Sequence, residues 1–472
     1  MLVTNTSDRR RAARLYVSAL ALALVFGWAA RARAGITDAV KAVTLKNNLR
    51  ILVLENHKAP VATLSVFYKV GSRNEQIGTT GISHLVEHLM FRGTKKLKPE
   101  EFSNIIQENG GMDNAFTTAD YTDYFEVINK DHLDVPISLE ADRMGNFDPK
   151  GFDSEKAVVI EERRMRTEDN PQDALGEITQ AQAYVAHPYH WPVIGWMHDI
   201  QNLTLSDALT YHLIYYSPQN AIVVAVGDFD GEKVIKQISE AFGTIPNGPK
   251  PPPVTDVEPP QDGERRVVLR HAAELPAFTA GFHVPNHESP DSFALEIATV
   301  VLAGGKSSRL YKELVINKRM VVDIDASYDS LAFDPTLFWT SAQLRPGFKT
   351  SDVTAVVDQQ IAALRDHPIT EQELQKAKNQ EQAGFVYGQD SIFREAMLLG
   401  QYEMLGSYKM LDQYMPGIDK VTAADVQRVA KKYLVDTNRT LGVLVPTGVL
   451  RHPAGGPSGG AVHHVMAGEE SR

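Results

Sequence analysis

The stretch Gly81-Ile-Ser-His-Leu-Val-Glu-His-Leu-Met-Phe91 places two histidines and a glutamate within five positions. In a helix, His84 and His88 are four residues apart and project from the same face. Two imidazoles one turn apart can share one Zn²⁺ at about 2.0–2.1 Å from each nitrogen. Glu87 lies beside them, in the inverse of the H-E-x-x-H order of zinc helices. The stretch therefore predicts a zinc site of the catalytic type. The alternative is that these are ordinary helix histidines in a chain that has 15 of them.

A third ligand is needed, because a catalytic zinc has three protein ligands and one position left for water. The chain has no cysteine, so the third ligand must be His, Asp or Glu. Residues 153–168 are predicted to form a helix, on which Glu155 and Glu162 are seven residues apart and share one face. Spacing alone leaves open whether this pair belongs to a metal site or to a solvated acidic face.

The first 34 residues have the pattern of an export signal. Arginines between positions 9 and 14 precede a mostly apolar run, Leu15–Ala30, and Ala32-Arg33-Ala34 gives a small-x-small cleavage pattern. We predict a cleavable signal peptide at residues 1–34, cleavage after Ala34 and a periplasmic location. The alternative is an uncleaved membrane anchor, although the apolar run is shorter than the about 20 residues that span a bilayer.

The composition is that of an ordinary globular protein large enough for two or three domains, with 472 residues, 43% hydrophobic and 23% charged. Removing residues 1–34 removes six arginines and one aspartate, so the formal net charge moves from −11 to −16. Such an acidic chain, without a basic stripe, argues against nucleic-acid binding. The Gly-rich stretch Ala303–Arg309 lacks the first glycine of a phosphate-binding loop, because position 300 is Val300, so no nucleotide site is predicted.

The chain contains an internal repeat at a constant offset of 218 residues. The matching pairs are Thr204 and Thr422, Asp207 and Asp425, Tyr215 and Tyr433, and Asn220 and Asn438. In both copies a threonine caps an amphipathic helix, and a β-rich run follows at 221–226 or 440–445. These features predict an α+β fold of two homologous domains, each a mainly antiparallel sheet with helices packed on one face.

The predicted organisation follows from this repeat and from a proline-dense segment between its copies. After the signal peptide, we predict a zinc-binding domain at 35–245, a proline-rich linker at 246–262, a homologous domain without the metal motif at 263–448, and a disordered tail at 449–472. Within the first domain, the predicted elements are strands at 51–54, 61–70 and 114–127 and helices at 81–91 and 99–109.

The histidine motif occurs together with other motifs along residues 40–447: Phe91-Arg-Gly-Thr94, Gly110-Gly-Met-Asp-Asn-Ala-Phe-Thr117, Glu155-Lys-Ala-Val-Val-Ile-Glu-Glu-Arg-Arg164 and His187-Pro-Tyr-His-Trp-Pro192. In combination they resemble the pitrilysin/insulinase family of zinc peptidases. The resemblance is closest to its half-length subfamily, which includes the mitochondrial processing peptidase and bacterial periplasmic relatives. It implies a zinc-dependent metalloendopeptidase with one Zn²⁺ per chain, whose catalytic domain is the first one.

The resemblance also assigns a role to each candidate site residue: His84 and His88 as the histidine ligands, Glu87 as the general base, Glu162 as the third ligand and Glu155 as the acid that steadies the site. The adjacent Glu161 stays open as a rival third ligand. On a helix, however, Glu161 points about 100° away from the face of Glu155.

The strand residues Asn114, Ala115, Phe116 and Thr117 resemble the edge strand on which this family accepts substrate by backbone pairing. Pairing of that kind favours extended or unfolded peptides over folded proteins. His187 and His190 are also close in sequence, but the prolines around them indicate a loop, and we predict packing roles for both.

The resemblance further implies a partner. Full-length members place an Arg and a Tyr, seven residues apart, opposite the catalytic site, whereas the corresponding stretch here is 312–319 and position 326 is Ala326. Complete chambers in the family contain four such domains, and this chain has two. We therefore predict a homologous, motif-less subunit that supplies the Arg and Tyr, with a homodimer as the alternative. The competing function is that of a non-catalytic structural subunit.

Overall fold

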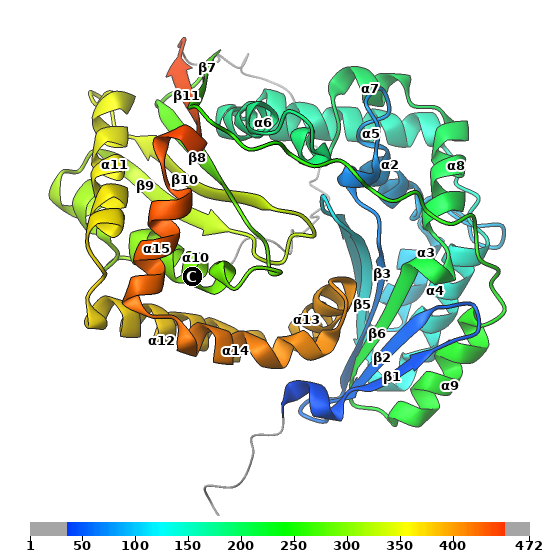
Figure 1. The fold of residues 1–472 in the computed structure, drawn as a ribbon. Helices are drawn as coiled ribbons and strands as arrows, with labels where there is room; N and C mark the ends of the chain where they lie inside the picture. Colours follow the sequence, from blue (N-terminus) through cyan, green and yellow to red (C-terminus); the bar gives the residue numbers. More distant parts are fainter. Residues whose placement is uncertain (1–34, 449–472) are drawn as a thin grey trace, which may run out of the picture.

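The computed structural model describes residues 35–448 (Figure 1). The predicted signal peptide at 1–34 and the predicted tail at 449–472 lie outside these residues. Two α+β halves face each other. The chain that joins them, between α9 (Gly231–Phe242) and β7 (Arg265–His271), contains no helix or strand. Within residues 35–448, no helix is long and apolar enough to cross a membrane.

Each half is built around one sheet. In the first half the strand order is β1 (Lys41–Thr44), β2 (Arg50–Glu55), β6 (Ala221–Gly227), β3 (Val61–Tyr68), β5 (Thr122–Asn129) and β4 (Met112–Thr117). In the second half it is β7, β11 (Arg439–Pro446), β8 (Ala277–Val284), β10 (Thr336–Leu344) and β9 (Val321–Tyr328). The pairs β2/β6 and β7/β11 are parallel and the other neighbours are antiparallel. The predicted α+β fold with two mainly antiparallel sheets is confirmed.

Helices of each half cover one face of its own sheet. In the first half these helices are α2 (Ile82–Leu89), α3 (Glu101–Glu108), α4 (Asp134–Gly145), α5 (Phe152–Arg163), α7 (Met197–Asn202), α8 (Leu205–Tyr215) and α9. In the second half they are α10 (Asp291–Ala303), α11 (Thr350–Asp366), α12 (Glu371–Gly388), α14 (Leu411–Lys420) and α15 (Ala423–Tyr433). Each set encloses an apolar core with its sheet, as the sequence predicted.

The other face of each sheet receives a helix from the opposite half, which the sequence did not predict. Helix α13 (Ile392–Met404) of the second half packs on β3 and β6, while α6 (Pro171–Ala183) of the first half packs on β7, β8 and β11. A Cβ at Gly400 would overlap the ring of Phe67, and one at Gly442 would overlap the hydroxyl of Thr179. Glycine at these positions lets helix and strand approach closely, so the halves interlock.

The predicted repeat is visible in individual hydrogen bonds. The side-chain amide of Asn220 donates to the carbonyl oxygen of Tyr215 at 2.9 Å, and that of Asn438 donates to Tyr433 at 2.8 Å. Both copies also have a capping box at the start of the preceding helix. The same local sequence therefore forms the same helix-to-strand junction twice.

One predicted element is wrong. The run 114–127 forms two strands, β4 and β5, joined by a turn at residues 118–121. The hydroxyl of Thr118 accepts hydrogen bonds from the backbone N–H groups of Asp120 (3.1 Å) and Tyr121 (3.0 Å). A threonine that bonds the backbone two and three residues ahead stabilises a turn. That local contact reverses the chain where β propensity alone predicts a continuous strand.

Candidate metal centre

Helix α2, which carries the histidine motif, is fixed at its N-terminus by groups outside the motif. Gly81 has a left-handed backbone conformation (φ +87°), and a Cβ there would collide with the carbonyl oxygen of Ile194. The buried carboxylate of Glu75 accepts hydrogen bonds from the backbone N–H groups of Gly81 (2.7 Å) and Ser83 (2.8 Å). These bonds satisfy donors that the start of a helix leaves unpaired.

His84 and His88 lie one turn apart on α2 and face Glu162 on α5. The distances from the Glu162 Oε2 atom are 3.7 Å to His84 Nε2 and 3.3 Å to His88 Nε2. Two atoms bound tetrahedrally to zinc, each about 2.0–2.1 Å from it, lie about 3.3 Å apart. Two imidazole nitrogens and one carboxylate oxygen at this spacing fit a zinc ion with one position left open. Within residues 35–448, this is the one such group of three His, Cys, Asp or Glu side chains.

Glu161 and Glu162 are separated by the geometry of α5. The second oxygen of Glu162, Oε1, forms an ion pair with Arg166 at 2.8 Å, while its Oε2 faces the histidines. The side chain of Glu161 is 59% exposed and pairs with Arg164 at 3.0 Å. Glu161 therefore lies away from the histidines, and the arrangement favours Glu162 as the third ligand.

Glu155 shares one face of α5 with Glu162 and contacts His88 at its second ring nitrogen. Its Oε1 atom is 3.0 Å from His88 Nδ1, and its Oε2 atom is 3.3 Å from Arg92 Nε. A carboxylate on the second ring nitrogen fixes the orientation of the imidazole, so that Nε2 stays directed at Glu162. The structure thus brings together all the residues of the motif and both acids predicted on α5.

Glu155→Gln is expected to weaken zinc binding by about 10–100-fold, which is typical for a residue that orients a ligand. The amide still accepts a hydrogen bond but carries no charge to stabilise the ring. The measurement is a competition titration of zinc against a chelator. Asp153→Asn, an exposed position on the same helix, is the matched control and should bind zinc like the wild type. Equal affinity of both variants would contradict the role of Glu155.

The surroundings shift the pKa values of the two histidines in opposite directions. Burial, together with His88, lowers the pKa of His84 to about 3, which leaves the neutral imidazole that binds metal. Burial also lowers the pKa of His88, but hydrogen bonds to Glu155 and Glu162 outweigh it and raise the pKa to about 10. Burial raises the pKa of Glu162, but the histidines and Arg166 outweigh it and bring the pKa to about 2. The two glutamates therefore favour a positive charge at His88, whereas burial disfavours one at His84.

Glu87 has a contact that the sequence did not predict. The hydroxyl of Thr117, the last residue of β4, donates a hydrogen bond to Glu87 Oε2 at 2.5 Å. Glu87 is 8% exposed, and burial raises its pKa, although His88 and Thr117 act in the opposite direction. Thr117 was predicted only as part of a peptide-binding strand. Its contact with the candidate base depends on how β4 lies against α2, for which the sequence holds no local signal.

Strand β4, with the candidate peptide-binding residues, is the last strand of the first sheet, and its neighbour among the described residues is β5. Ala115 and Thr117 face α2, where Ala115 packs against the core. Phe116 points to the opposite face, against Tyr121 and Phe125. This alternation is that of a regular strand.

His187 and His190, for which the sequence predicts packing roles, lie apart from the metal centre. His190 Nδ1 is 2.7 Å from the carbonyl oxygen of Tyr184, and His187 Nε2 is 3.0 Å from a carboxylate oxygen of Asp334 in the second half. Neither belongs to the His/His/Glu group. Both have polar contacts within the protein.

The structure thus consists of two interlocked α+β halves, with a His/His/Glu group that fits a metal ion between two helices of the first half. The family model described as "Insulinase (Peptidase family M16)" matches residues 50–195, and that described as "Peptidase M16 inactive domain" matches residues 202–381. The chain belongs to the pitrilysin/insulinase family of zinc peptidases, peptidase family M16, as one of its half-length members.

Individual relatives agree with this assignment. The chain is 37% identical to "Zinc protease PqqE" of Helicobacter pylori, over 86% of this chain and 93% of the relative. It superimposes on the crystal structure of a protease from Helicobacter pylori with a TM-score of 0.84 at 36% identity, over 86% of this chain and 99% of the other. It is also 23% identical to the probable mitochondrial-processing peptidase subunit beta of Arabidopsis thaliana, over 86% of this chain and 78% of the relative.

Proposed function

We propose that the protein is a zinc endopeptidase that hydrolyses extended or unfolded peptides. One Zn²⁺ per chain is held by His84, His88 and Glu162, Glu155 orients His88, and Glu87 is the general base. The observation that carries the proposal is the position of Glu162 Oε2, at 3.3 and 3.7 Å from the two Nε2 atoms. The zinc-protease names of the relatives support the class of reaction.

When bound, zinc lowers the pKa of a water ligand to about 7 and polarises the scissile carbonyl group. Glu87 takes the proton from the attacking water and returns it to the leaving amine. Its burial favours this role, because a raised pKa makes the carboxylate a stronger base at neutral pH. The hydroxyl of Thr117 donates a hydrogen bond to Oε2 of Glu87 and so holds the carboxylate in place.

We further propose that the peptide pairs with the outer edge of β4, along Asn114, Ala115, Phe116 and Thr117. This is the last strand of its sheet, and its final residue contacts Glu87, so a paired peptide runs past the candidate base. In this proposal residues 35–245 form the catalytic domain, and residues 263–448, after the linker at 246–262, form its homologous partner domain.

Location and assembly complete the proposal. The export pattern at residues 1–34 supports a periplasmic location. A homologous subunit is proposed to supply the Arg and Tyr that this chain lacks at the corresponding positions, or else a second copy completes the chamber. The similarity to a relative named as a subunit, the mitochondrial-processing peptidase subunit beta, supports an assembly of subunits.

The test is peptide hydrolysis by the purified chain, with a pool of unstructured peptides read by mass spectrometry. Cleavage is expected with zinc, loss of cleavage after chelation, and recovery after zinc is added back. If the chain alone binds zinc but does not cleave, the complex isolated from cells is tested in the same way. A zinc-loaded chain and complex that both leave the pool intact would contradict the proposal and favour the structural subunit.

A further inference from the structure

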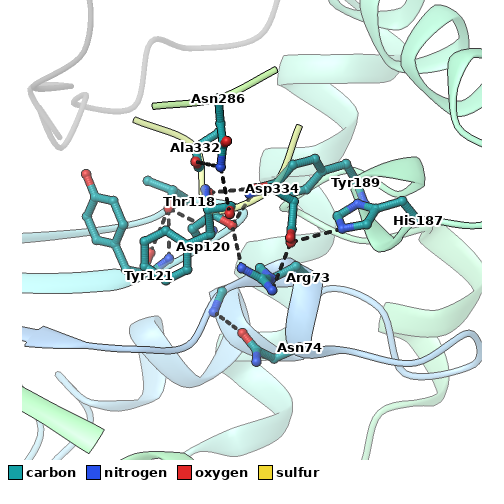
Figure 2. Close-up of polar contacts among 12 residues, drawn as sticks. Arg73, Asn74, Thr118, Asp120, Tyr121, His187, Tyr189, Asn286, Ala332 and Asp334 are labelled. Carbon is teal, nitrogen blue, oxygen red and sulfur yellow. Dashed lines mark hydrogen bonds and ion pairs between the residues drawn. The ribbon is translucent and has the colours of Figure 1, made fainter. Parts of the chain in front are cut away.

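The turn between β4 and β5, residues 118–121, is held by the second half of the chain (Figure 2). Asp120 in this turn is 7% exposed and accepts a hydrogen bond from the backbone N–H of Phe333 at 3.0 Å. The same carboxylate accepts a hydrogen bond from the hydroxyl of Tyr189 at 2.7 Å. Phe333 belongs to the β9–β10 loop, residues 329–335, so this acid joins the two halves.

A second acid completes the contact. Arg73, whose side chain is 13% exposed, forms ion pairs with Asp334 of the β9–β10 loop at 2.8 Å and with Asp120 at 3.5 Å. Figure 2 shows Asp334 between Arg73 and His187, which is 3.0 Å away on the other side. We call Arg73, Asp120, Tyr189, His187 and Asp334 the inter-half lock. Removing one acid from such a half-buried ionic network weakens the compensation of the Arg73 charge.

The β9–β10 loop is itself braced within the second half. The side-chain amide of Asn286 donates to the carbonyl oxygens of Ala332 (3.1 Å) and Phe333 (2.9 Å). The inter-half lock therefore joins the β4–β5 turn to a loop that is itself held in place by hydrogen bonds. Helix α13 adds another contact, since Gln401 donates to the hydroxyl of Tyr121 at 2.8 Å.

The lock is connected to both sides of the candidate active site. The backbone N–H of Arg73 donates to the carbonyl oxygen of Ala119 in the turn at 2.9 Å. Two residues after Arg73, Glu75 fixes the start of α2, the helix of the candidate ligands. Just before the turn, Thr117 contacts Glu87. A shift of the turn would thus move β4 relative to the candidate base.

We propose that Asp120 and Asp334 are positioning residues for peptide hydrolysis: by fixing the β4–β5 turn to the β9–β10 loop, they hold the peptide-pairing strand in register with Glu87. This inference rests on the proposed function. It gives the second half an indirect role in the reaction. The position of β4 depends on the β9–β10 loop, which contributes no group to the metal centre. Misplacement by about 1 Å is enough to cost about 100-fold in rate.

The test compares Asp120→Asn and Asp334→Asn with Asp323→Asn. Asp323 lies on β9, and its hydrogen bond from the backbone of Gln343 stays within the second half, so it is the matched control. In both lock variants, faster hydrogen exchange is expected at the backbone amides of β4 but not at those of β3 and β6. With zinc content unchanged, kcat/KM for an extended peptide should fall about 10–100-fold, through a lower kcat as β4 loses its register with Glu87 and a higher KM as it pairs peptide less well.

Unchanged β4 exchange and unchanged kcat/KM in the lock variants would overturn the proposal. Faster exchange throughout the first sheet, or loss of zinc, would also overturn it, because the lock would then serve folding in general. If Asp120→Asn does not fold, Asp334→Asn decides, since its side chain is 30% exposed. If the wild type cleaves no peptide, the proposed function fails, while hydrogen exchange still decides whether the lock orders β4.

Discussion

Glu87→Gln is expected to lower the rate of peptide hydrolysis by about 10²–10⁴-fold, the usual contribution of a general base, with zinc binding retained. Glutamine has the size of glutamate and still accepts the hydrogen bond from Thr117. It has no basic oxygen at neutral pH, so the attacking water keeps its proton. The three candidate ligand side chains are untouched, so the metal should remain.

The measurement is kcat for one cleaved peptide, with zinc content determined on the same preparation. Glu108→Gln, an exposed position at the end of α3, is the matched control and should hydrolyse the peptide at the wild-type rate. Near-wild-type hydrolysis by Glu87→Gln would remove Glu87 from the mechanism. Loss of zinc together with activity would instead mean that Glu87 is needed to build the metal site.

The second large effect is expected at Glu162 of α5, and the neighbouring Glu161 is the control. Glu162→Gln should weaken zinc binding by more than about 100-fold, beyond the range of residues that merely orient a ligand. An uncharged amide is a poor zinc ligand, and the pair of histidines alone does not complete the site. Glu161→Gln removes the same charge one residue away, on the exposed face of the helix. Zinc affinity in that variant is expected to equal the wild type within about twofold.

Competition titration against a chelator measures both affinities, and circular dichroism confirms that both variants fold. The pair controls for charge, for helix position and for side-chain size at once. A loss of zinc in Glu161→Gln with none in Glu162→Gln would reverse the assignment of the third ligand. Equal losses in both variants would show that helix α5, and not one carboxylate, is what the site requires.

Patterns within single helices were the most predictable part of the site. His84 and His88 depend on a separation of four residues, and Glu155 and Glu162 on one of seven, both of which follow from helical geometry. The repeat was predictable for the same reason, since capping boxes and junctions such as Asn220 and Asn438 are local. The roles of these residues, by contrast, came from resemblance to a family, because spacing does not distinguish a ligand from a solvated acid.

Contacts between distant segments were not predictable. The hydroxyl of Thr117 reaches Glu87 only because β4 is placed beside α2 by the order of the sheet. The turn at 118–121 was missed, since β-forming residues flank it on both sides. Helix α6 packs on the sheet of the second half, α13 packs on the sheet of the first, and Arg73 pairs with Asp334. These contacts join segments that are far apart in the sequence.

The most direct test of the metal centre is an anomalous difference map at the zinc absorption edge from crystals of the zinc-loaded protein. We predict one peak per chain, at about 2.0–2.1 Å from Nε2 of His84, Nε2 of His88 and a carboxylate oxygen of Glu162. A peak at any other group of side chains, or no peak at these three, would contradict the assignment of this protein's site.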